Sequence, residues 1–175
     1  MVYLIQIKRM FPKNALYFIF LPILMISACK KAPNYPKEPS ITLKEFRVVS
    51  YQSNKTDTVF IALNFKDGDG DLGNDPLIPN NKDFFVQIQR KENGIFNPVN
   101  LGALNFDAAL PLLSPYRAVG PIDGIINRKI GLEFPPALDT LAQYDTLKFE
   151  FRIKDRASNY SNWIETDTMV LWRNF

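Results

Sequence analysis

The chain has 175 residues, a formal net charge of +3, a single cysteine and no histidine. The absence of histidine excludes Ser-His and Cys-His nucleophilic catalysis, histidine-ligated zinc and histidine pH switches. Hydrophobic residues make up 46% of the chain, which is enough to build the core of one domain.

The N-terminal segment has the order of a secretory signal. Three basic residues within 8–13 precede an apolar run at 15–26, and small residues follow it. The run is shorter than the ~20 apolar residues that span a bilayer. Pro22 would also cost a spanning helix about 3 kcal/mol. A cleaved leader is therefore expected over residues 1–28.

The end of this leader, Ile26-Ser27-Ala28-Cys29, resembles the lipobox of bacterial lipoproteins. The resemblance implies that Cys29 becomes the first residue of the mature chain and carries covalent lipid, including fatty acyl groups such as palmitate. Several acyl chains together give firm membrane anchoring. The alternatives are an ordinary signal with a chance cysteine and an uncleaved membrane anchor.

Removal of the leader changes the charge balance. Residues 1–28 contain three basic and no acidic side chains, so the remaining 147 residues hold 18 of each sign and carry no net charge. The basic balance of the full chain is thus no argument for a nucleic-acid partner. Residues 29–40 are polar and proline-bearing, which predicts a lipid-anchored flexible tether ahead of a domain at 41–175.

The residues after Cys29 bear on location. Lys30 stands where an aspartate would retain enterobacterial lipoproteins in the inner membrane, so an outer-membrane position is expected. Lys30 and Lys31 also replace the acidic run typical of surface-export signals. This favours the periplasmic face over the cell surface.

Beyond the tether, hydrophobic residues recur with a period of two, which is typical of strands with one buried face. The clearest case is 147–154, where Leu147, Phe149, Phe151 and Ile153 alternate with polar residues. Expected strands lie at 41–51, 59–66, 83–91, 95–100, 126–133, 147–154 and 163–172. The segment 108–113 could form a helical turn and 136–144 a short helix. Together these elements predict an all-β fold, a single antiparallel immunoglobulin-like β-sandwich of about seven strands.

The richest motif, DGDGDLGND at 67–75, directly follows one of these strands. Its glycines permit a curl that turns several carboxylates toward one point, and a hard cation such as Ca²⁺ would relieve their repulsion. It is not an EF-hand, because Leu72 replaces the required glycine and Ile78 the required glutamate. The alternative is a solvated Asp-Gly turn.

A second motif, KDRASNYSN at 154–162, follows another alternating strand. Asp155 could add a carboxylate to the same site or could hold its own turn with Asn159. The candidate Ca²⁺ ligands are therefore Asp67, Asp69, Asp71, Asp75 and Asp155.

The two motifs, together with Asp145-Thr146-Leu147-Lys148-Phe149, make the chain from about residue 41 to 171 resemble small lipoproteins of Bacteroidota with one immunoglobulin- or fibronectin-III-like domain. The resemblance implies fold and membrane attachment, and no particular activity. Ser158 departs from the pattern, since members often have glycine there.

No catalytic set is recognisable, and the Gly-rich carboxylate cluster is unlike the apolar cleft of a glycosidase. We therefore expect a non-enzyme, an accessory or scaffold lipoprotein that docks on an outer-membrane protein complex. The alternative is a cell-surface glycan- or ligand-binding module that uses exposed aromatic side chains, unless these pack in the core. The candidate contacts are Tyr116, Tyr144, Tyr160, Trp163 and Trp172.

Overall fold

The computed structural model describes residues 33–51, 56–74, 81–102, 104–112, 120–132 and 144–171. The chain divides into two compact units, Met1–Pro33 and Asn34–Phe175, and the account below concerns the second. Four of the candidate site residues lie outside the described ranges: Cys29, Asp75, Tyr116 and Trp172. Within those ranges, no helix is long and apolar enough to cross a membrane.

The second unit is built from β-strands, as the alternating hydrophobic pattern predicts. The strands are β1 (Ser40–Tyr51), β2 (Thr56–Asp67), β3 (Phe84–Glu92), β4 (Ile95–Pro98), β5 (Ile122–Leu132), β6 (Thr146–Ile153), β7 (Ile164–Glu165) and β8 (Met169–Val170). No helix occurs among the described residues.

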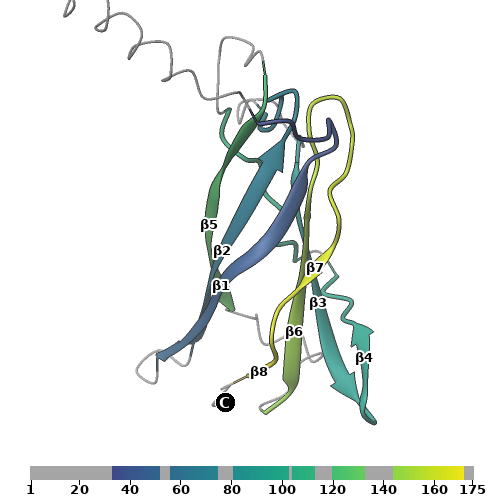
Figure 1. The fold of residues 1–175 in the computed structure, drawn as a ribbon. Helices are drawn as coiled ribbons and strands as arrows, with labels where there is room; N and C mark the ends of the chain where they lie inside the picture. The colour runs from purple at the N-terminus through teal and green to yellow at the C-terminus, as the bar shows by residue number, and fades with distance from the viewer. Residues whose placement is uncertain are drawn as a thin grey trace, which may run out of the picture. The chain divides into compact units, whose positions relative to one another are not determined.

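Two antiparallel sheets face each other (Figure 1). One has the order β1-β2-β5, and the other has the order β4-β3-β6-β7 with β8 also paired to β6. This is the strand order of an immunoglobulin-like sandwich in which the fourth strand joins the larger sheet. The predicted fold class is confirmed.

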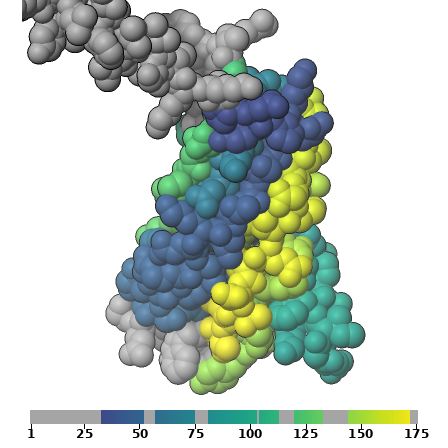
Figure 2. Space-filling model, viewed as in Figure 1, coloured from purple at the N-terminus to yellow at the C-terminus, as the bar shows by residue number. Residues whose placement is uncertain are grey.

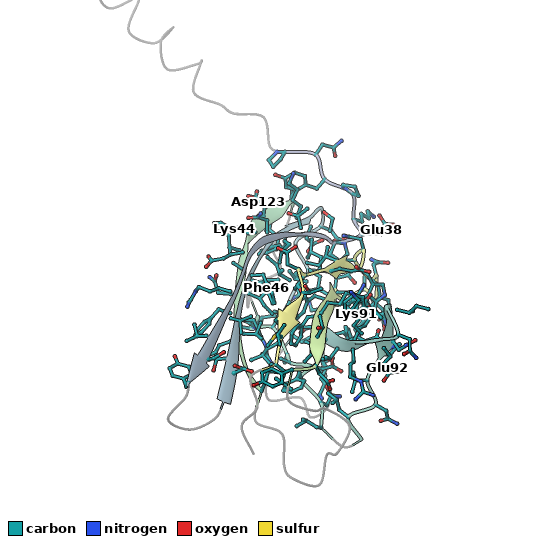
Figure 3. The ribbon with its side chains drawn as sticks, turned by 90° about the horizontal axis from the view of Figure 1, so that it is seen from below. Glu38, Lys44, Phe46, Lys91, Glu92 and Asp123 are labelled. Atoms are coloured by element: carbon teal, nitrogen blue, oxygen red, sulfur yellow. The ribbon has the colours of Figure 1, made fainter. Side chains whose placement is uncertain are left out.

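The core lies between the sheets and follows the period-two pattern. All four inward residues of β6, from Leu147 to Ile153, are fully buried, and alternate residues of β2 from Val59 to Phe65 face them. The ring of Phe46 projects between the sheets (Figure 3) and lies 6.3 Å from that of Phe149, centroid to centroid. Burial of these apolar side chains supplies the main stabilisation.

Three local details differ from the sequence expectation. A β-bulge at Lys44 shifts the pairing between β1 and β2. The predicted last strand, 163–172, is two short pieces separated at 166–168. The expected helical turn at 108–113 is wrong for its described part, where Ala108 instead forms a bridge with Phe84. The expected helix at 136–144 lies outside the described residues except for its last one.

The two sheets are also joined along one edge. The C-terminal segment runs beside β1 on the face seen in Figure 2. There the side chain of Asn162 pairs with both backbone polar groups of Ile41, each at 3.0 Å. This contact fastens the loop after β6 to the first strand of the other sheet.

Residues 34–39, at the end of the expected tether, contact the sandwich. The Tyr35 hydroxyl donates a hydrogen bond to Asp123 at 3.2 Å, and Lys66 lies over the Tyr35 ring. A Cβ atom on Gly68 would lie 2.3 Å from the carbonyl oxygen of Pro36, so only glycine allows this approach. The chain therefore enters the sandwich beside the acidic loop.

Candidate metal centre

The acidic loop begins where β2 ends, at Asp67. The backbone then turns so that Leu72 enters the core, where it is fully buried. Gly73 has a φ of 91°, and a Cβ atom there would lie 2.3 Å from the carbonyl oxygen of Pro111. The buried Leu72 and the glycine together fix the curl that the sequence motif predicts.

This curl brings carboxylates from two distant loops together. Asp67, Asp69, Asp71 and Asp155 each offer an oxygen, and these atoms all lie within 4.8 Å of one another. Asp67 and Asp155 are fully buried, while Asp69 and Asp71 are partly exposed. A buried cluster of acidic side chains with this spacing could hold a metal ion.

The hydrogen bonding of the cluster leaves oxygens unused. The Oδ2 atom of Asp67 accepts a hydrogen bond from the Leu72 amide at 3.1 Å, and that of Asp71 accepts one from the Ala157 amide at 3.0 Å. The Oδ1 atoms of Asp67, Asp69 and Asp71 are buried and have no hydrogen-bond donor. Buried polar atoms are normally satisfied, and a cation could satisfy all three of these acceptors.

The electrostatics point the same way. Burial, followed by the charges of Asp69 and Asp71, raises the pKa of Asp67 to about 6. Burial also raises the pKa of Asp71, with Asp155 and Asp69 adding to the effect. Both carboxylates are thus held at a cost in free energy that a bound cation would remove.

Asp155 holds its own turn and also lies in the carboxylate cluster. Its Oδ1 and Oδ2 accept hydrogen bonds from the backbone and side chain of Asn159, at 2.7 and 2.8 Å. The Asp155 amide donates in turn to the Asn159 carbonyl at 3.0 Å. The turn is therefore self-supporting, and it presents the same carboxylate to the cluster. Ser158 in this turn has a φ of 72°, which explains why glycine would suit that position.

Backbone contacts connect the two loops beside the cluster. Leu72 and Asp155 form an antiparallel bridge, and the Arg156 guanidinium donates to the Gly73 carbonyl at 3.2 Å. Because β2 and β6 belong to different sheets, the cluster lies where the end of one sheet meets the end of the other.

Three of the five predicted aromatic contacts lie in the described part of the chain. Tyr144, Tyr160 and Trp163 are all exposed, at 58%, 46% and 43%. Tyr144 precedes β6, whereas Tyr160 and Trp163 follow it, so Tyr144 lies at the opposite end of the strand. Of these three described residues, Tyr160 and Trp163 lie close to each other and Tyr144 does not.

Sequence reasoning missed two polar residues near these sites. Asp83 is fully buried and accepts hydrogen bonds from the Asn74 side chain at 3.0 Å and from the Leu110 amide, which fastens the acidic loop to the 104–112 segment. Arg152 lies among Phe85, Tyr160 and Trp163. Its outward position in the alternating strand is the signal that could have identified it.

Comparison with known proteins gives no guide to either site. No protein-family model, curated protein or solved structure matches the chain.

Proposed function

We propose that the chain is a non-enzymatic, membrane-anchored binding protein whose β-sandwich is stabilised by a calcium ion at Asp67, Asp69, Asp71 and Asp155. The observation that carries the calcium proposal is the buried Oδ1 atom of Asp67, which lacks a donor within a cluster of four carboxylates.

The donor set decides which ion is proposed. It consists of carboxylate oxygens, and the chain has no histidine while its one cysteine precedes the domain. Hard oxygen donors favour Ca²⁺ or Mg²⁺ over zinc and other transition metals. Ca²⁺ accepts six to eight oxygens in flexible geometry, whereas Mg²⁺ keeps several waters and rarely occupies a cage made only of protein groups. Backbone carbonyls or water would complete the calcium shell.

The calcium proposal is tested by thermal unfolding of the purified chain in excess calcium and in chelator. An ion that binds only the folded state stabilises it by about 2.7 kcal/mol at 100 times its dissociation constant. We expect a higher melting temperature in calcium and a smaller increase in magnesium at equal concentration. Equal melting temperatures in calcium and chelator would refute the proposal.

We further propose that the sandwich is an accessory or scaffold subunit that docks on an outer-membrane protein complex, held there by lipid on Cys29. The leader and the small β domain support this assignment, and so does the absence of a recognisable catalytic set from the sequence. The periplasmic face is the proposed side.

Docking is tested by affinity purification from native membranes after mild solubilisation. The wild-type chain should bring down one outer-membrane complex in constant proportion. A Cys29→Ser variant should lose membrane attachment and with it most of that complex. Recovery of the lipoprotein alone under mild conditions would count against docking, and unchanged membrane attachment of Cys29→Ser would count against the lipid anchor.

A further inference from the structure

The outer face of the larger sheet carries a second unusual group, which we name the aromatic–arginine patch. Its members are Phe85 on β3, Arg152 on β6, and Lys154, Tyr160 and Trp163 in the segment that follows β6. Phe85 lies directly opposite Arg152 in the strand register, and Tyr160 forms a bridge with Lys154. The patch shares no residue with the acidic cluster.

Arg152 is the centre of the patch. Its guanidinium carbon lies 4.2 Å from the ring centroid of Tyr160 and 4.5 Å from that of Trp163. The Phe85 ring is 5.4 Å away. Three aromatic rings therefore surround one planar cation and restrict its movement, which pre-organises the guanidinium group.

The guanidinium has hydrogen-bonding capacity left over. Its Nε atom is buried and closed to a ligand, so the Nη groups carry the available donors, and Arg152 makes no ion pair among the described residues. Partly buried arginines normally satisfy their donors with carboxylates, backbone carbonyls or water. An arginine that is held by rings and still lacks an anionic partner has the features of a binding group for an external anion.

The patch contains a second cation. Lys154 lies beside Arg152, with its nitrogen 6.0 Å from the ring centroids of Phe85 and of Tyr160. On the same face, Glu165 is paired with Lys148 at 2.7 Å and lies opposite Glu150, the outward residue of β6 nearest to Arg152. Neither cation of the patch forms an ion pair within the described part of the chain, although Lys154 also acts to lower the pKa of the buried Asp83, which burial raises.

We propose that the aromatic–arginine patch binds an acidic polysaccharide through a carboxylate-bearing sugar unit. The guanidinium edge and the Lys154 ammonium hold the carboxylate, and the exposed parts of Tyr160 and Trp163 pack against the sugar's C–H groups. This inference goes beyond the calcium and docking proposals and depends on neither.

The size of the patch favours a sugar over a protein partner. A stable protein–protein interface takes about 20–30 residues on each side. The patch has five, and Glu150 and Glu165 lie next along the same face. Five side chains with two cations match one or two anionic sugar units.

The test is calorimetric titration of the full chain, in mild detergent and excess calcium, with polygalacturonate and with uncharged dextran. Polygalacturonate should bind and dextran should not. Arg152→Ala should weaken binding at least tenfold. Arg152→Lys should also weaken it, because an ammonium group cannot form the bidentate contact. Trp163→Ala should weaken it about fivefold, as expected of an aromatic contact residue.

The matched control is Lys91→Ala. Lys91 is exposed on the same strand as Phe85 but at the far end of β3 (Figure 3), so the variant removes an equal charge outside the patch. Its affinity for polygalacturonate should stay within twofold of wild type. Three results would overturn the proposal: no binding of polygalacturonate, equal binding of dextran, or equal losses in Lys91→Ala and Arg152→Ala. Melting temperatures of all variants identify any loss caused by unfolding.

Discussion

Asp67 is the residue on which the acidic cluster depends most. It ends β2, it is fully buried, and one of its oxygens holds the Leu72 amide while the other has no donor. The charges of its neighbours Asp69 and Asp71 repel its own charge and raise its pKa further. The repulsion within the cluster therefore opposes folding, and a bound cation would remove that cost.

The first residue-scale prediction concerns the ligands. In the double variant Asp69→Ala, Asp71→Ala, added calcium should no longer raise the melting temperature. The stabilisation lost is about 2.7 kcal/mol at a calcium concentration 100 times the wild-type dissociation constant. In chelator, the variant should be at least as stable as wild type, because two like charges are gone. Differential scanning calorimetry with and without calcium measures both effects.

The control for that experiment is Glu38→Ala with Asp167→Ala, which removes two exposed acidic side chains outside the cluster. This control should keep the full response to calcium. A calcium response that survives in the Asp69/Asp71 variant would show that the ion binds elsewhere.

The second residue-scale prediction concerns pH in the presence of chelator. Because the pKa of Asp67 rises from 3.8 to about 6 on folding, the folded chain holds this proton more tightly than the unfolded chain. Protonation of Asp67 therefore contributes to the free energy of unfolding. This contribution is fully present below pH 3.8 and is lost as the pH rises through about 6. Urea unfolding across this range should show the loss in wild type and a smaller one in Asp67→Asn. Identical pH profiles for the two proteins would contradict the assignment.

At the scale of the elements, β6 is the strand that the core needs most. It pairs with β3, β7 and β8, and its inward side chains are all fully buried. Phe149→Ala should destabilise the domain by about 3–5 kcal/mol, because a large buried ring leaves a cavity. Glu150→Ala, one residue along on the outer face, should change stability by less than about 0.5 kcal/mol. Urea unfolding at constant calcium compares the two, and similar losses would mean that the inward face of β6 is wrongly assigned.

The strands could be predicted because alternation is a local signal. Two interruptions of these strands could not be predicted, because they depend on tertiary contacts. In the last strand, the Thr166 hydroxyl accepts a hydrogen bond from the Phe149 amide at 3.1 Å and replaces a backbone partner. In β1, the bulge at Lys44 lets both Leu43 and Phe46 face the core although two polar residues separate them.

The two candidate sites also differ in how far the sequence alone predicts them. The carboxylates of Asp67, Asp69 and Asp71 are close in sequence, so their convergence could be predicted from glycine spacing. The contribution of Asp155 could only be suggested, because it requires two loops to meet at one end of the sandwich. Arg152 contacts Phe85 because β3 pairs with β6, and the register of that pairing could not be predicted from the sequence.

At the scale of the whole molecule, the acidic cluster lies where the two sheets meet. Asp67 ends a strand of the three-stranded sheet, and Asp155 follows a strand of the five-stranded sheet. The chain has one cysteine, so no disulfide can make this connection within it. A cation at the cluster would supply a cross-link of comparable position.

Hydrogen exchange of the full chain tests the cross-link. Calcium should slow exchange at the amides of Leu72, Ala157 and Asn159 together, since these amides hold the two loops at the cluster. The β3–β4 hairpin, at the other end of β6 by register, should exchange at the same rate with and without calcium. Protection of only one loop would mean that the ion does not link the sheets.

The packing of Tyr35 and Pro36 against Gly68 has a mechanical consequence. If the N-terminus is held at a membrane, as the leader predicts, a pulling force reaches the sandwich through this contact before it reaches the core. The acidic loop is then the first element to bear tension, and a calcium ion there would act as a clamp against detachment of β2 from the opposing sheet. The domain should therefore resist extension in a single-molecule pulling experiment more strongly in calcium than in chelator.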